Sequence, residues 1–159
     1  MGIGLVIGHA AWLRDKRSEV HHRDLRAWCL LLVTAGSGWY RDADGEKPVR
    51  TGDVLTLFPG RRHGYGPAPG TVWDEVFCVV HGPLARALHD AGLLPVGAPV
   101  RHAGSSPALI EAFDRVVRHA AAPAPDAAVG AALVHLLAAE VAAAARQAAA
   151  HPDAELARH

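Results

Sequence analysis

The chain has 159 residues, of which 50% are hydrophobic, and this is enough for one domain with a substantial core. Its 16 basic and 16 acidic residues cancel, and the isoelectric point is about 7.2. Proteins that bind nucleic acid usually carry a basic excess, because neutralising phosphates supplies much of their affinity. This chain by itself is therefore not expected to bind DNA or RNA.

The first residues and the two cysteines indicate the compartment. The apolar start MGIGLVIGHAAWL lacks the basic region of a signal peptide and is too short to span a bilayer. Cys29 and Cys78 lie inside apolar runs, so we expect them to be reduced core residues. These features predict a cytoplasmic protein with no membrane partner.

Short runs typical of β-strands fill the chain up to residue 82. AWCLLLVTAG (27–36) is an apolar run that ends at glycine, and DVLTLF (53–58) is the next. Between them, DADG (42–45) contains the Asp-Gly pair that tight hairpin turns favour. TVWDEVFCVV (71–80) alternates at first and is then fully apolar. Strands at this spacing predict a sandwich or a small barrel over residues 1–82.

Helical patterns follow from residue 83 to residue 150. GPLARALHDAG (82–92) has proline at its start and glycine at its end, as a short helix prefers. SSPALIEAFDRVVRHA (105–120) can be capped by Ser106, and an alanine-rich run can be capped by Asp126. The loop AAPAP makes these last two an antiparallel pair. We expect the pair to pack on the barrel within one domain, with residues 151–159 as a tail or the start of a linker.

Each helix of the pair carries an apolar stripe that has to be covered. The stripes are Leu109, Ile110, Phe113, Val116 and Val117 in the first, and Val129, Leu133, Leu136, Leu137 and Val141 in the second. One face can pack on the barrel, and a second copy of the chain is the natural cover for any stripe that remains. The pattern favours a homodimer, and the alternative is that a monomer uses both stripes.

Several short motifs lie between residue 27 and residue 92. They are Gly36-x-Gly38 after an apolar strand, Gly52-Asp53 before the next strand, and Pro59-Gly60-x-x-His63 with Tyr65 after it. The strand WDEVFCVVHGP runs into a helix, and a helix pair follows later. Together these motifs resemble the amino-terminal effector-binding domain of AraC-type transcription regulators.

The resemblance implies a cupin-like β-barrel (a jelly roll, or double-stranded β-helix) followed by an antiparallel pair of dimerisation helices. In that family the barrel binds a small effector, often a sugar, and a separate helix-turn-helix domain binds DNA. We expect that second domain to be absent from this chain, so the chain is interpreted as the sensor part of a longer regulator.

Several cupins are metalloenzymes, which makes His63 a candidate metal ligand. Metal cupins use an early His-x-His and a Glu with this histidine, but the corresponding positions here are Arg23 and Leu25. Adjacent histidines in a strand point to opposite faces, so His21 and His22 cannot chelate together. A triad of His63, Glu75 and His21 remains possible in the right register. We expect no metal and no other cofactor, with His63 in the turn or at the edge of the pocket.

Candidate ligand-binding residues come from the resemblance and from strand parity. Tyr65, Glu75 and Phe77 fall on ligand-contact positions of the arabinose-responsive member, and His21 or Arg23 falls near a basic one. Trp73 shares a strand face with Glu75 and Phe77, so it extends an aromatic platform of the kind that sugar sites use. Phe77 is as easily explained as core.

Glu75 and the amino-terminal segment complete the candidate site. A buried Glu75 needs Arg23, His21, His63 or a ligand hydroxyl as partner. In the family a mobile arm closes over the pocket, a role for which His9 and Trp12 are candidates here.

The sequence therefore favours a non-enzymatic domain that binds a small effector, sugar-like or polyol, and forms a homodimer through its carboxy-terminal helices. The alternatives are a small metal-dependent cupin enzyme, such as an isomerase or dioxygenase, and a bare scaffold for association. The effector itself is not expected to be arabinose, because the polar positions of the pocket differ.

Overall fold

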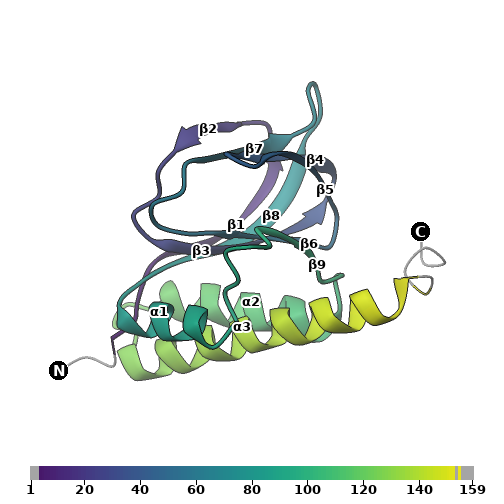
Figure 1. Cartoon of the computed structure of the whole chain (residues 1–159). Coiled ribbons are helices and arrows are strands. Elements are labelled where there is room, and N and C mark those ends of the chain that lie inside the picture. Colours follow the sequence, from purple (N-terminus) through teal and green to yellow (C-terminus); the bar gives the residue numbers. More distant parts are fainter. Residues whose placement is uncertain (1–3, 153, 155–159) are drawn as a thin grey trace.

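A computed structural model describes residues 4–152 and residue 154. Nine strands form two antiparallel sheets, and three helices lie under one of them (Figure 1). The prediction of a cupin-like barrel with carboxy-terminal helices is confirmed. Of the tail expected at 151–159, residues 151, 152 and 154 are described, and the rest of that prediction lies outside the described residues.

The larger sheet has the order β1-β8-β3-β6-β9, and the smaller sheet has the order β2-β7-β4-β5. The strands of the larger sheet are β1 (Val6–Lys16), β8 (Trp73–His81), β3 (Trp28–Ala35), β6 (Asp53–Leu57) and β9 (Val100–His102). Those of the smaller sheet are β2 (Val20–Arg23), β7 (His63–Pro67), β4 (Ser37–Asp42) and β5 (Gly45–Arg50). The hairpin predicted at residues 42–45 joins β4 to β5.

The side chains of the larger sheet divide by parity between two cores, as a two-residue period requires. Leu30, Leu32, Val76 and Cys78 face the helices, whereas Leu31, Val33 and Trp73 face the smaller sheet. The second of these cores is the barrel interior, and it contains the candidate site.

The three helices are α1 (Pro83–Asp90), α2 (Pro107–Ala120) and α3 (Ala127–Ala150). The predicted caps are present: Ser106 Oγ accepts the Leu109 N–H at 3.3 Å, and Asp126 accepts the N–H groups of Ala128 and Val129. These bonds use N–H groups that the first helical turn leaves without intrahelical partners.

The apolar stripe of α3 is only partly covered within one copy of the chain. Leu137 and Val141 are fully buried, but Val129 is 49% exposed and Leu136 is 41% exposed. By length and composition α3 is also apolar enough to cross a membrane, although 39% of its most apolar window is buried against the rest of the protein. A core helix of a soluble protein has the same property.

Close approach of two strands explains the Gly-x-Gly motif. A Cβ on Gly38 would lie 2.0 Å from the carbonyl oxygen of Gly66, where β4 pairs with β7. Gly36 has a φ of +92° and packs against Trp73, where any side chain would clash. The motif therefore fixes how closely the smaller sheet folds over the interior.

Candidate functional site

The barrel interior holds a cluster of aromatic and charged side chains from four strands, β1, β2, β7 and β8. Tyr65 on β7 and Trp73 on β8 lie nearly parallel, with ring centroids 6.3 Å apart and an angle of 15° between their planes. Tyr65 is 4% exposed and Trp73 is 1% exposed. Burial raises the pKa of the Tyr65 phenol, so its hydroxyl stays protonated at neutral pH. The two rings therefore lie together in the barrel interior, and their role as an aromatic platform for a ligand stays a prediction.

Glu75 is buried in the same interior, 1% exposed, as its parity with Trp73 predicted. Both carboxylate oxygens accept from Lys16 Nζ at 3.1 Å, and Trp73 Nε1 donates to Oε2 at 2.7 Å. The Lys16 ammonium also lies 4.5 Å from the centroid of the Tyr65 ring. A buried carboxylate needs partners of this kind, a cation and a neutral donor, to offset its lost hydration. The Lys16–Glu75 ion pair therefore packs against the Tyr65 and Trp73 rings.

Lys16 is the interior residue that sequence reasoning missed. The cation for Glu75 was sought among Arg23, His21 and His63, but it comes from the end of β1. The register of β1 against β8 shifts between Leu13 and Lys16, where Asp15 has a φ of +49°. This irregularity turns Lys16 toward the interior. Strand parity alone does not reveal it, and the only signal in the sequence was the need of a buried Glu75 for a cation.

Arg23 and His63 also lie against Tyr65, and they pair across β2 and β7. Arg23 Nη2 donates to the Tyr65 hydroxyl at 3.4 Å, and the His63 ring stacks on the Tyr65 ring with centroids 6.1 Å apart. His63 Nδ1 lies 3.2 Å from the Arg61 carbonyl oxygen, which assigns the ring proton to Nδ1. Burial lowers the pKa of His63, so the ring is neutral at pH 7.

Two nitrogens in this pair have no hydrogen-bond partner in the part of the chain that the structure describes. They are Arg23 Nε, a donor, and His63 Nε2, an acceptor in the neutral tautomer. A buried polar atom without a partner costs about 1–3 kcal/mol. A hydroxyl group both donates and accepts, so one hydroxyl can satisfy an unpaired donor and an unpaired acceptor together.

A cleft of about 360 Å³ borders this part of the interior. His63 lines it together with the outer face of β4 and the turn before β7; the other lining side chains include His21, Trp39, Arg41 and Arg62. His63 therefore belongs both to the interior cluster and to a cleft that opens to solvent.

The remaining predicted residues lie apart from the cluster. His21 is exposed on β2, bonds Glu19 at 2.8 Å and lies against Trp39, so it reaches the outer cleft and not the interior. Phe77 packs at the edge of the interior core, with its ring 5.1 Å from that of His9. Of the basic candidates, Arg23 is thus the interior one.

Residues 6–16 form a strand of the barrel, in which His9 lies against Phe77 and Trp12 faces the other side of the sheet. Val6–Lys16 pairs along β8 as an edge strand. Trp12 faces the helices, where its Nε1 donates to Asp114 on α2 at 3.1 Å. The hypothesis that Trp12 closes the pocket is therefore wrong, because strand parity turns its ring to the other side of the sheet.

The metal triad left open by the sequence is not assembled. His21 is bonded to Glu19 outside the barrel, and Glu75 is engaged by Lys16 and Trp73. Among the described residues, no three His, Cys, Asp or Glu side chains converge as a metal site requires.

Three comparisons with known proteins found similar sequences and a similar fold. The family model of the AraC-like ligand binding domain matches residues 4–148. The MmsAB operon regulatory protein of Pseudomonas aeruginosa is 33% identical over 123 residues, which cover 71% of this chain and 38% of that protein. The structure of ToxT from Vibrio cholerae superposes with a TM-score of 0.50 and 8% identity, covering 82% of this chain and 53% of that one.

A shorter match links part of the chain to an enzyme. The (R)-mandelonitrile lyase of Granulicella tundricola is 38% identical over 47 residues, or 29% of this chain and 36% of that protein. The chain matches well under half the length of either curated relative.

Proposed function

Since the chain belongs to the AraC-like ligand-binding domain family, we propose that it is the effector-sensing part of a longer cytoplasmic transcription regulator. The regulator among its relatives is much longer than the matched region, and we assign DNA binding to such additional sequence. The balanced charge of this chain supports that division, because nothing in its composition favours phosphate contacts.

The proposed effector is a small polyhydroxylated molecule, a sugar or polyol, bound beside Tyr65. The observation that carries this proposal is the unpaired donor and acceptor of Arg23 and His63 next to stacked aromatic rings. An effector hydroxyl completes both hydrogen bonds, and the carbon skeleton lies on the rings. A cationic ligand is disfavoured because Lys16 already neutralises Glu75.

The proposed domain is not an enzyme. The partial match to a lyase and the cupin fold keep a metal-dependent cupin enzyme as the second candidate. It is the weaker of the two, since Glu75 would have to leave its buried ion pair to bind a metal.

A thermal-shift panel distinguishes the two candidates. The chain is heated with sugars, polyols, sugar acids and amines, each with and without a chelator and divalent metals. A ligand at about one hundred times its dissociation constant stabilises by roughly 2.7 kcal/mol, or several degrees at this size. A polyol shift that survives the chelator supports the sensor. A shift that needs metal supports the enzyme and contradicts the sensor.

We also propose that the domain forms a homodimer through α2 and α3. The support is the uncovered part of the α3 stripe, where Val129 and Leu136 lie two turns apart on one helix face. A Leu136→Glu variant is expected to be monomeric by sedimentation velocity at concentrations where the wild type is a dimer. Ala87→Glu, on the exposed side of α1, is the matched control and stays a dimer. A monomeric wild type contradicts the proposal.

A further inference from the structure

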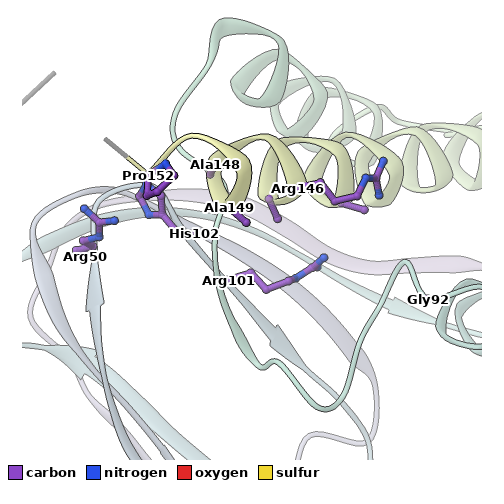
Figure 2. Close-up of a pocket in the computed structure, with 10 residues that line it drawn as sticks. Arg50, Gly92, Arg101, His102, Arg146, Ala148, Ala149 and Pro152 are labelled. Carbon is purple, nitrogen blue, oxygen red and sulfur yellow. The ribbon is translucent and has the colours of Figure 1, made fainter. Parts of the chain in front are cut away.

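A second cleft lies outside the barrel, between its rim and the carboxy-terminal half of α3 (Figure 2). Its volume is about 810 Å³, within the range of sites for small molecules. It is lined by the end of β5, by β9, by the turn at Gly92 and by one face of α3. None of its residues belongs to the interior cluster around Tyr65.

Three arginines reach this cleft from different elements: Arg50 from β5, Arg101 from β9 and Arg146 from α3. In Figure 2 the side chain of Arg101 runs beneath α3, Arg146 projects from the helix, and Arg50 lies at the other end beside His102. Guanidinium groups stay charged at any physiological pH, so the cleft carries three positive charges.

No carboxylate among the described residues lies within ion-pair distance of these three guanidinium groups. The acidic residue nearest in the sheet, Asp53, is already engaged: it accepts from the Arg50 backbone N–H at 2.9 Å and bonds His102 Nδ1 at 2.7 Å. The chain as a whole is neutral, and of the ten other arginines that the structure describes, five form ion pairs with acidic side chains: Arg14, Arg41, Arg61, Arg86 and Arg118. Among the described residues, the cleft is therefore a local excess of positive charge.

Arg101 is the member with the strongest need for a ligand. Its Nε is buried and has no hydrogen-bond partner in the described part of the chain, and its Nη2 makes only a long contact of 3.5 Å to Thr56 Oγ1. Burial also lowers the pKa of its guanidinium, because the charge has lost part of its hydration. An anion here replaces lost hydration with charge-assisted hydrogen bonds.

The α3 side of the cleft is made of small apolar side chains. They are Ala142, Ala145, Ala148 and Ala149. Methyl groups leave room for a short carbon skeleton but offer no platform for an aromatic ring. The arginines are spread along the cleft, so more than one negative group can be paired at once.

We propose that this cleft is a second ligand site, which takes a small organic or inorganic anion with two or three negative groups, carboxylate or phosphate. The anion pairs with Arg101 at its centre and with Arg146 and Arg50 at its two ends. It thereby ties β9 and the rim of the barrel to the last turns of α3, the helix that precedes any carboxy-terminal extension. The site is independent of the polyol site proposed inside the barrel.

Isothermal titration calorimetry at constant ionic strength tests this proposal. Citrate and inorganic pyrophosphate are the probes for the two anion types, and chloride is the control for screening. We expect saturable one-to-one binding of at least one probe, weakened about tenfold or more in Arg101→Gln and in Arg146→Gln. Arg86→Gln, which removes an exposed arginine of α1 with the same change in net charge, leaves the affinity unchanged.

A second readout locates the anion even if one variant fails to fold. In the wild type, the Arg101 side-chain Nε–H resonance in a ¹⁵N-correlated spectrum shifts with the same saturation curve as the calorimetry. Binding of citrate alone or of pyrophosphate alone supports the proposal and identifies the source of the negative groups. The proposal is overturned if neither probe binds, if chloride reproduces the effect, or if Arg146→Gln and Arg86→Gln bind equally well.

Discussion

Replacing Lys16 by methionine tests the internal support of the site. The change keeps an apolar stem of similar length and removes the cation that both Glu75 oxygens contact at 3.1 Å. The two side chains are 8% and 2% exposed, so water does not replace the lost partner. Removing one partner of a buried ion pair costs about 3–5 kcal/mol.

The lower end of that range applies here, because the Trp73 N–H continues to donate to Glu75 at 2.7 Å. We expect Lys16→Met to lower the free energy of unfolding by about 3 kcal/mol, which corresponds to roughly 6–12 °C in Tm for a chain of this size. Urea denaturation followed by far-ultraviolet circular dichroism measures the change at one fixed protein concentration, since the proposed dimerisation would be linked to stability.

The double variant Lys16→Met with Glu75→Gln is the control. It removes both charges and keeps an acceptor for Trp73, so it is expected to recover to within about 1 kcal/mol of the wild type. The reasoning is refuted if Lys16→Met changes stability by less than about 0.5 kcal/mol, or if the double variant is less stable than the single one.

Three further predictions concern His63, the glycine motif and the cysteines. Burial lowers the pKa of His63 in the folded state, so its neutral form contributes stability above the unfolded pKa of about 6.5, and this stability is lost as the pH falls. In urea titrations, His63→Gln is therefore expected to lose less stability than the wild type between pH 7 and pH 5. The same dependence of stability on pH in both proteins would contradict this. Gly38→Ala places a Cβ 2.0 Å from the Gly66 carbonyl oxygen, so it is expected to lower the free energy of unfolding by about 3 kcal/mol or more, seen as a lower Tm. A variant as stable as the wild type would show that β4 and β7 do not pack so closely. Burial raises the pKa of both thiols, and that of Cys78 rises to about 12. We therefore expect neither Cys29 nor Cys78 to react with a thiol reagent until the chain unfolds. Stoichiometric labelling of the native protein would contradict their burial in the cores.

The sequence predicted the elements whose signals are local. The helices around Ser106 and Asp126 were readable because proline, caps and apolar periodicity all lie within a few residues. Strands at 27–36, 53–58 and 71–80 were readable as apolar runs. Strand β7 was not, because its sequence HGYGP is shaped by neighbours: Gly64 and Gly66 allow β2 and the residue before it to pack closely.

In the candidate site too, features with a local sequence signal could be predicted and contacts between distant strands could not. The shared face of Trp73 and Glu75 follows from a two-residue period within one strand, and the structure has both buried in the interior. The partnership of Glu75 with Lys16 depends on an irregular register between strands 59 residues apart in sequence, which no local pattern encodes. Arg23 and His21 differ in the side of the sheet that each side chain faces. The irregular pairing of β2 with β7 determines which of the two points into the interior.

The central claim is that an effector hydroxyl is bound by Arg23 and His63 beside Tyr65. Its most direct test is the dissociation constant of the best polyol or sugar from the thermal-shift panel, measured for the wild type, Arg23→Gln and Arg26→Gln. Arg26 is exposed and three residues from Arg23, and it is the matched control. We expect about tenfold weaker binding or more in Arg23→Gln and no change in Arg26→Gln. Equal affinities in all three proteins, or no polyol that binds at all, would contradict the account.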